Sequence, residues 1–440
     1  MLNYIWLGLI VLAVIIGGCH DGLKEVSDAA FKMAEYAVIN TALPLAGILA
    51  LWLGVMRVAE RAGLVALLAR GLRPGLRWLF PDVPGDHPAM GSMVMNIAAN
   101  VLGLGNAATP LGLRAMRDLE TLNRLPGTAT NAMCTFLAIN TSSVQLIPAT
   151  AIAILAANHS TNPTAIVGTS ILATACGAVA AVAAAKSLQR LPCFRLPPAP
   201  GRPVAAAAAT SAARANGDQP VVKEAQALQP LRWWGLALLL LFGLFFLYLF
   251  ARLALPEAAK QTGFVRVVDA LSKLAIPFLL SAFPLYAALR GVKVYEEFVA
   301  GAKEGFEVAI RIIPYLVAIL VAIGMFRAAG GIDLVSHYLG PVLLALGFPP
   351  ELLPLVLMRP LSGSGTLGVL AELVKQYGPD SLVARMGGTI YGSTETTFYV
   401  LAVYFGSVAV SKTRYAVLAG LTADFVAVVA SVIVCRLVFG

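Results

Sequence analysis

Long stretches without any charged side chain are the feature that most limits what this chain can fold into. They cover residues 1–20, 36–56, 125–185 and 233–251. About 20 helical residues cross the hydrocarbon core of a bilayer, so each stretch is long enough, and 125–185 has room for two crossings joined near 158–162. The first stretch lacks the basic segment and cleavage site of a signal peptide, so we expect it to remain as a span. The sequence predicts an all-α polytopic membrane protein.

The composition supports the same class of protein. Of the 440 residues, 59% are hydrophobic and only 12% are charged, whereas soluble domains are usually about 45–50% apolar and about 25% charged. This difference excludes a water-soluble enzyme, a disordered chain and a nucleic-acid binder, and it makes the lipid bilayer the main partner. The net charge of +9 is therefore evidence about topology, because basic residues collect in cytoplasmic loops.

A proline- and alanine-rich segment, residues 186–231, divides the chain into two membrane halves. Its prolines are Pro192, Pro197, Pro198, Pro200, Pro203, Pro220 and Pro230. Such a composition is typical of a flexible linker without a core of its own. We expect a first membrane repeat at 1–185, a connecting transmembrane helix at 232–254 and a second repeat at 264–440.

The two halves carry similar motifs in the same order. Glu35, Pro44, Arg57 and Gly63 correspond to Glu307, Pro314, Arg327 and Gly330. Residues 95–105 correspond in the same way to 358–365, and 140–143 to 392–396. Internal repeats of this kind are typical of membrane transporters.

Basic residues indicate that the repeats have inverted topology. After the first Met-Arg motif the chain carries Arg57, Arg61, Arg70, Arg73 and Arg77, whereas the matching segment of the second half carries only Arg327 before Glu351. The loop between the last two spans shows the reverse, because 158–162 has no Lys or Arg and its counterpart holds Lys412 and Arg414. By the positive-inside rule the halves lie in opposite senses, with the linker in the cytoplasm.

Two uncharged or nearly uncharged segments contain too many helix-breaking residues to be ordinary spans. They are 88–113, with several glycines and Pro110, and 352–370, with Arg359-Pro360 followed by Ser362-Gly-Ser-Gly365. Non-helical backbone at membrane depth is tolerated only inside protein or beside water. We therefore interpret both as discontinuous, re-entrant helices. The alternative is that the glycines allow close packing and the asparagines bond between helices.

A second pair of polar motifs lies in the following spans, at 140–145 and 392–399. Glu395 is the strongest single candidate for a functional residue, because a carboxylate within a membrane span is costly and usually has a function. It binds a solute or a coupling proton, or it pairs structurally with Arg359. Asp424 is also within a span, and we expect it to be a structural partner of Lys412 or Arg414.

The broken segments and the polar motifs together predict one solute site at mid-bilayer, built from both repeats. Amides and hydroxyls suit a neutral hydrogen-bonding solute better than a bare metal ion, and the Arg–Glu pair could serve a zwitterion or a proton. The candidate substrate-binding residues are Asn96, Asn100, Asn106, Thr109, Asn140, Thr141, Ser142, Gln145, Arg359, Ser362, Ser364, Thr366, Ser393, Thr394, Glu395 and Thr396.

The sequence offers no pattern that indicates a metal, a cofactor or catalysis. The five cysteines and four histidines are scattered, without CxxC or HExxH spacing, whereas zinc and iron–sulfur sites need paired ligands. There is also no nucleophile–base set or phosphate-binding loop. We expect no metal, no cofactor and no enzyme activity.

Several strings resemble known families. Residues 51–54, 86–91, 95–100 and 102–110 resemble the bacterial spore maturation protein A family, and 294–298, 301–305, 358–365 and 392–399 resemble the spore maturation protein B family. Both are similar to the nucleoside recognition, or Gate-domain, group. The resemblance implies an integral protein of the bacterial inner membrane in which both proteins are fused into one chain.

Two functions remain open from the sequence. The first is a transporter or permease for a small polar solute, with a nucleoside-like solute as one candidate. The second is a non-transporting membrane scaffold or assembly factor related to spore maturation, whose polar motifs only hold helices together. It predicts a closed, self-bonded interior without a cavity. A homo-oligomer is left open as a further partner.

Overall fold

The structure, a computed structural model, describes residues 2–103, 105–142, 144–196, 229–255, 263–331, 334, 341, 343 and 347–440. Within these ranges the chain is almost entirely helical, and its extended segments form only an isolated bridge between Thr128 and Lys412. The all-α fold class predicted from the sequence is confirmed. Most of the linker predicted at 186–231 lies outside the described residues.

The first repeat consists of nine α-helices in the described ranges. They are α1 (Leu2–Cys19), α2 (Leu23–Tyr36), α3 (Leu43–Arg61), α4 (Leu64–Leu79), α5 (Pro88–Val101), α6 (Gly105–Glu120), α7 (Asn131–Thr141), α8 (Ala149–Ala157) and α9 (Ile166–Leu188). A π-helical turn, η1 (Ala37–Ala42), joins α2 to α3, and short 3₁₀ turns lie at η2 (Pro163–Ala165) and η3 (Pro192–Phe194).

The second repeat has corresponding elements. After the connecting helix α11 (Trp233–Ala254) come α12 (Gly263–Leu289), α13 (Val294–Ala328), η4 (Pro350–Leu352), α15 (Leu353–Met358), α16 (Gly363–Tyr377), α17 (Leu382–Ser393), α18 (Thr397–Gly406) and α19 (Ala416–Phe439). In order, α13 corresponds to α2–α3, the α15–α16 hairpin to α5–α6, the broken pair α17–α18 to α7–α8, and α19 to α9.

Corresponding helices of the two repeats pack against each other in opposite directions. Along α3 and α13, Arg61 meets Glu297, Ala50 meets Gly305 and Met33, in α2, meets Gly324. Because the order of contacts runs backwards, α13 is antiparallel to α2–α3. The repeats therefore have inverted topology, as the basic residues predict.

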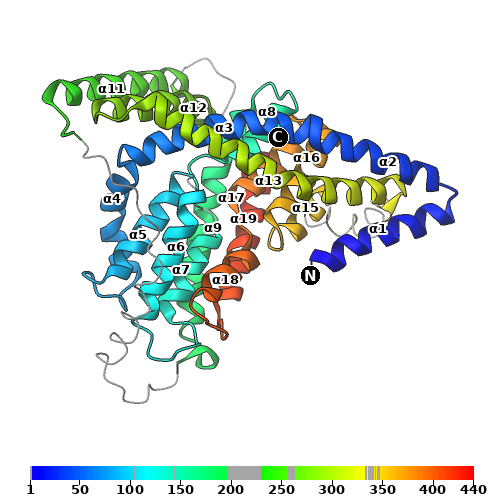
Figure 1. Ribbon diagram of the computed structural model, residues 1–440, viewed down its shortest axis with the longest axis horizontal. Helices are drawn as coiled ribbons and strands as arrows, with labels where there is room; N and C mark the ends of the chain where they lie inside the picture. The colour runs from blue at the N-terminus through cyan, green and yellow to red at the C-terminus, as the bar shows by residue number, and fades with distance from the viewer. Residues whose placement is uncertain are drawn as a thin grey trace.

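The same reversal holds at the centre of the molecule, where α9 packs against α19. The hydroxyl of Thr389 contacts both the hydroxyl of Thr169, near the start of α9, and the thiol of Cys435, near the end of α19. In the middle, Gly177 lies against Ala427. Past the end of α9, the ring of Phe194 packs edge-on against that of Tyr415, which directly precedes α19, with 5.8 Å between centroids. Figure 1 shows α9, α17 and α19 together in the middle of the fold.

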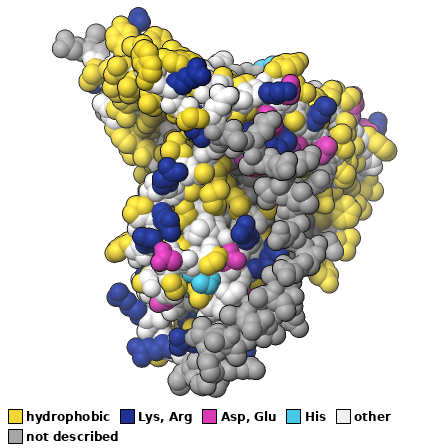
Figure 2. Space-filling model, turned by 60° about the vertical axis from the view of Figure 1, so that its left-hand side comes forward, with side chains coloured by type: hydrophobic (Ala, Val, Ile, Leu, Met, Phe, Trp, Pro, Cys, Tyr) yellow, Lys and Arg dark blue, Asp and Glu magenta, His cyan; other side chains and the backbone are white. Residues whose placement is uncertain are grey.

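Six helical stretches of the described residues are long and apolar enough to cross a membrane. They are Leu23–Arg61, Pro163–Leu188, Trp233–Ala254, Gly263–Leu289, Val294–Ala328 and Ala416–Phe439. The connecting helix α11 exposes many of its leucine side chains and Phe245, and Figure 2 shows hydrophobic side chains gathered over this end of the molecule. Burying such a surface in lipid removes it from water. The protein is a multi-pass membrane protein.

Loops of the two repeats also meet, at opposite ends of α9. Near its start, Asp380 accepts hydrogen bonds from Ser160 Oγ at 2.6 Å and from Thr161 N and Oγ1, both at 2.8 Å. Near its end, the backbone N–H of Lys412 donates to Gly127 O at 3.0 Å. These two contacts join equivalent loops, because the loop before α7 corresponds to the loop before α17, and the loop before α9 to the loop before α19.

Candidate functional site

Helix breaks from both repeats meet in the interior, and specific residues explain where each break begins or ends. The α15–α16 break holds Pro360, which lacks an N–H for a helical bond, and Ser362, whose Oγ accepts from Gly365 N at 3.0 Å as the N-cap of α16. The α7–α8 break ends at Pro148, the residue before α8. The predicted discontinuous segments at 88–113 and 352–370 are broken, at 102–103 and 359–362.

The breaks of the two repeats are joined by a main-chain hydrogen bond. The N–H of Glu395, in the α17–α18 break, donates to the carbonyl of Thr141, the last residue of α7, at 3.1 Å. A helix end leaves its last carbonyl groups without intrahelical partners. Each break therefore satisfies part of the other, and the polar motifs 140–145 and 392–399 lie together.

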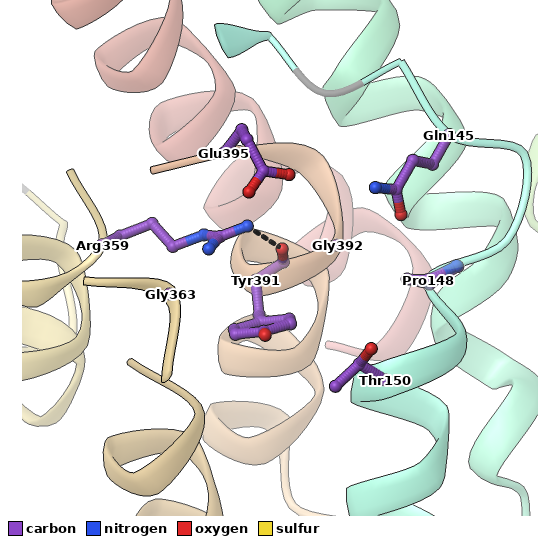
Figure 3. A pocket seen from close by; sticks show the side chains of 8 residues that line it. All are labelled: Gln145, Pro148, Thr150, Arg359, Gly363, Tyr391, Gly392 and Glu395. Carbon is purple, nitrogen blue, oxygen red and sulfur yellow. Dashed lines mark hydrogen bonds between the residues drawn. The ribbon is translucent and has the colours of Figure 1, made fainter. Parts of the chain in front are cut away.

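A cavity of about 200 Å³ opens between these breaks. Its lining comes from the α7–α8 break and the start of α8, from the α15–α16 break, and from the end of α17 and the break after it: Gln145, Pro148, Thr150, Arg359, Gly363, Tyr391, Gly392 and Glu395. Figure 3 shows Gln145 and Thr150 on one wall and Arg359 and Glu395 on the other. The cavity thus presents an amide, a hydroxyl, a guanidinium and a carboxylate.

Arg359 holds the end of α17. Its Nη2 donates to Tyr391 O at 3.0 Å and also to Thr394 O, and its Nε donates to Thr394 Oγ1 at 3.0 Å. The guanidinium lies over the Tyr391 ring, 4.4 Å from the centroid. A cation at a helix C-terminus meets the negative end of the helix dipole. The side chain is 4% exposed, so Arg359 forms the wall between the cavity and the α17 carbonyls.

Three of the predicted site residues, Gln145, Arg359 and Glu395, line this cavity. A second polar group lies where α5, α7 and α18 meet. There Asn100 Nδ2 donates to Asn140 Oδ1 at 2.9 Å, and Asn96 Nδ2 donates to Ala108 O at 2.8 Å. The hydroxyl of Tyr404 lies 3.4 Å from Asn96 Nδ2 and 3.5 Å from Asn140 Oδ1.

Most of the predicted hydroxyls bond to nearby helix backbone. Thr141, Ser142 and Thr394 donate to carbonyls three or four residues earlier, as Thr366 does to Ser362 O at 2.6 Å. Ser393 likewise donates to Ile390 O at 3.4 Å and also contacts Ser431 at 3.1 Å. Ser362, the N-cap of α16, contacts Ser364 at 3.4 Å, and Thr396 accepts from Arg359 at 3.5 Å. Thr109 lies in α6, and the side chain of Asn106 lies outside the described residues.

Five lining residues were not among those predicted. Gly363 and Gly392 belong to motifs that the repeats share, so their position at a break is the signal that could have found them. Pro148 is a proline directly before a helix, which is a signal for a helix end. Thr150 and Tyr391 are ordinary helix positions, without a distinguishing sequence signal.

The predicted partner of Asp424 is wrong. Its Oδ2 accepts from Thr397 Oγ1 at 2.5 Å, whereas Arg414 donates to Phe194 O, to Ala129 O and to Asn131 Oδ1. The physical reason is the helix itself. Asp424 lies more than two turns into α19, so at about 1.5 Å per residue it is far from the loop that carries Lys412 and Arg414. In the described part of the chain, no three His, Cys, Asp or Glu side chains come together as metal ligands would.

This architecture matches a known protein family. The sequence profile of the Gate family, described as "Nucleoside recognition", matches residues 42–188 and 309–411, together more than half of the chain. The chain belongs to the Gate family. The two matched segments fall in the two repeats, and the resemblance predicted from the motifs is confirmed.

Two curated relatives of this Gate-family protein match different lengths of it. Spore maturation protein B of Bacillus subtilis (strain 168) is 46% identical over 176 residues, which is 40% of this chain and 99% of that protein. Spore maturation protein A of the same organism is 46% identical over 182 residues, 41% of this chain and 92% of that protein. The lengths of these matches agree with a fusion of both proteins.

Among solved structures, the YdaH transporter of Alcanivorax borkumensis, described as having an unusual topology, aligns with 99% of this chain and 97% of its own. The TM-score is 0.36 and the sequence identity 15%.

Proposed function

We propose that this Gate-family protein is a transporter, in the bacterial inner membrane, for a small polar solute that binds in the cavity between the helix breaks. The observation that carries the proposal is that breaks from both inverted repeats contribute to one polar cavity. Inverted-repeat transporters bind their substrates where discontinuous helices of the two repeats meet. Alternating access then follows from movement of one repeat against the other.

The lining favours a solute that both donates and accepts hydrogen bonds. Gln145 and Thr150 can do both, while Arg359 donates and Glu395 accepts. The cavity, about 200 Å³, is smaller than the roughly 300–1,000 Å³ of pockets that hold drug-sized ligands. The family description makes nucleosides one candidate, and the opposite charges of Arg359 and Glu395 make small zwitterions such as amino acids another.

The direct test is uptake by proteoliposomes that contain the purified full-length protein. Radiolabelled uridine represents nucleosides and radiolabelled glycine represents small zwitterions. We expect saturable uptake of one of them above that of protein-free liposomes. Glu395→Gln and Gln145→Ala should lower it at least tenfold, because each removes a group from the cavity wall.

The matched control is Glu296→Gln, which makes the same chemical change at the exposed start of α13, where the Glu296 side chain is 66% exposed. This variant should transport like the parent protein. Uptake that is unchanged by both cavity substitutions would contradict the assignment of this cavity as the solute site.

One observation favours the scaffold alternative. Arg359 and most of the predicted hydroxyls already bond to helix backbone, as side chains that only hold helices together would. The scaffold function predicts that Arg359→Ala impairs folding while Glu395→Gln and Gln145→Ala change nothing. The uptake assay therefore separates the two functions.

A further inference from the structure

A buried carboxylate in α19 stands out among the acidic side chains of the described interior. Asp424 is 6% exposed. Its Oδ2 accepts from Thr397 Oγ1 at 2.5 Å, and its Oδ1 has no hydrogen-bond partner among the described residues. Thr397 is the first residue of α18 and follows the break that carries Glu395. This hydrogen bond therefore joins Asp424 to the segment that carries Glu395, a residue of the proposed solute cavity.

No basic side chain of the described residues forms an ion pair with Asp424. The other buried carboxylate of a helix interior differs in this respect, since Glu372 in α16 is 2% exposed and pairs with Arg327. The buried guanidinium of Arg359 is directed to the end of α17 instead, where it donates to Tyr391 O and to Thr394 Oγ1. An ionised carboxylate buried without a counter-charge is costly.

Several titratable side chains of the helices that pack against α19 bond to, pair with or contact other groups. Cys134 of α7 donates to Thr413 O, and Lys186 of α9 donates to Leu79 O. In α17, Tyr391 lies beneath the guanidinium of Arg359, and Arg385 pairs with Asp380. Tyr404 of α18 contacts Asn96, and Asp269 of α12 pairs with Lys273. Among these described groups, none supplies the positive charge that an ionised Asp424 would need.

The inverted repeat shows what a purely structural side chain does at this position. Thr174 lies eight residues after the first residue of α9, as Asp424 does in α19. The Thr174 hydroxyl donates to Ser142 O, in the α7–α8 break, at 2.9 Å. A neutral hydroxyl therefore suffices to tie this helix to the neighbouring break. The carboxyl group in the second repeat adds a titratable proton that this tie does not need.

We propose that Asp424 is a proton-binding site, protonated at neutral pH, and that it couples proton movement to solute movement. The coupling part rests on the transport function proposed above. Release of the proton leaves a negative charge at Thr397 and hence at the start of α18. Since Glu395 lies two residues earlier, a proton on Asp424 and a solute in the cavity act on the same short segment.

The proton site can be tested without any solute. Infrared spectroscopy of the full-length protein in lipid nanodiscs at pH 7 distinguishes the C=O band of a carboxylic acid from the bands of a carboxylate. We expect the acid band in the parent protein and its loss in Asp424→Asn and Asp424→Thr. It should persist in Glu372→Gln, which removes an ion-paired carboxylate, and in Glu395→Gln.

Asp424→Thr is the safer variant, because threonine stands at the equivalent position of the first repeat, and an unchanged elution volume on size exclusion verifies its fold. The proposal is overturned if the parent protein lacks the acid band, if Asp424→Thr keeps it, or if Glu395→Gln removes it. It is also overturned if sodium ions abolish the band at pH 7, because the site would then bind sodium in place of the proton.

A transport measurement tests the coupling. With the solute that the uptake assay identifies, an inward proton gradient should accelerate uptake by the parent protein, whereas Asp424→Thr should retain only the uptake seen without a gradient. Equal acceleration in both proteins would overturn the coupling role. If the acid band behaves as expected but no solute is taken up, the proton site stands and the transport function fails.

Discussion

The N–H of Glu395 and the carbonyl of Thr141, 3.1 Å apart, join the helix breaks of two inverted repeats. The two residues are 254 positions apart, and each lies where its own repeat stops being helical. Backbone groups freed at a break must find partners when they are buried. Because each repeat supplies part of what the other lacks, neither repeat alone can complete the cavity, which is a physical reason for carrying both in one chain.

Arg359 should be a stabilising residue whose geometry matters more than its charge. Arg359→Ala removes several charge-assisted hydrogen bonds to the end of α17 and should cost on the order of 3 kcal/mol. Arg359→Lys keeps the charge but cannot fork between two carbonyls, so it should lie between the parent protein and the alanine variant. The apparent melting temperature of the detergent-solubilised protein measures this order.

Arg252 provides the control for Arg359, because it is exposed near the end of α11. Arg252→Ala and Arg252→Lys should both melt like the parent protein. If Arg359→Lys proved as stable as the parent, the forked hydrogen bonds would not be what holds α17.

The contact between the loops before α9 and α17 should depend on pH only under acidic conditions. Partial burial would raise the pKa of the Asp380 carboxyl, but hydrogen bonds from Ser160 and Thr161 and the charge of Arg385 lower that pKa from its usual 3.8 to about 2. Because the folded-state pKa is below the unfolded one, the stabilisation is complete above the unfolded value and is lost as the pH falls through about 2.

Asp380→Asn should therefore lower the melting temperature by a constant amount between about pH 5 and pH 8, and the difference from the parent should shrink below about pH 4. Asp269→Asn is the control, because Asp269 pairs with Lys273 on an exposed helix surface, where ion pairs contribute little. A difference for Asp380→Asn that grew on acidification would contradict the assigned direction.

The helical repeats and their breaks could be predicted because they depend on local chemistry. A long run without charge favours a membrane span, and proline and glycine interrupt a helix, whatever the rest of the chain does. The broken segments 88–113 and 352–370 can therefore be recognised from their own sequence. The direction of each repeat could also be predicted, because Lys412 and Arg414 mark one end of the second half and 158–162 lacks such charges in the first.

Which side chains converge could not be predicted in the same way. Thr150 and Tyr391 line the cavity only because α8 and α17 present those positions to the same space, and nothing in their local sequence distinguishes them. The partner of Asp424 was missed because nearness in sequence suggested Arg414, while the axial rise of α19 separates the two. Convergence depends on helix packing, which a single sequence does not contain.

The inverted arrangement predicts which loops are reached from which side of the membrane. Gln376, at the end of α16 near Asp380, and Ser411, beside Lys412, are both exposed and lie at opposite ends of α9. In a cysteine-free background, Ser411→Cys should react with a membrane-impermeant maleimide only from the cytoplasmic side, because the basic residues lie there. Gln376→Cys should react only from the other side. Labelling of both from one side would contradict the topology.

The antiparallel packing of α13 on α3 should depend on two glycines one turn apart. A Cβ atom on Gly301 would lie 2.5 Å from Leu53 O, and one on Gly305 would lie 2.5 Å from Ala50 Cα. Both obstacles are backbone atoms, which cannot move away as a flexible side chain can. Small residues at this spacing let membrane helices approach closely, so Gly301→Ala and Gly305→Ala should each cost about 1–3 kcal/mol through overpacking.

Gly47 offers the matched control within α3, because a Cβ atom there would meet no atom within 4 Å. Gly47→Ala should leave the melting temperature unchanged or raise it, since alanine is the better helix former by roughly 0.5–1 kcal/mol. The contact also brings Arg57 within 2.9 Å of Glu297, so separating the helices would break this ion pair between the repeats. If Gly305→Ala melted like Gly47→Ala, close approach of α3 and α13 would not be a source of stability, and the pairing of the repeats would have to depend on α9 and α19.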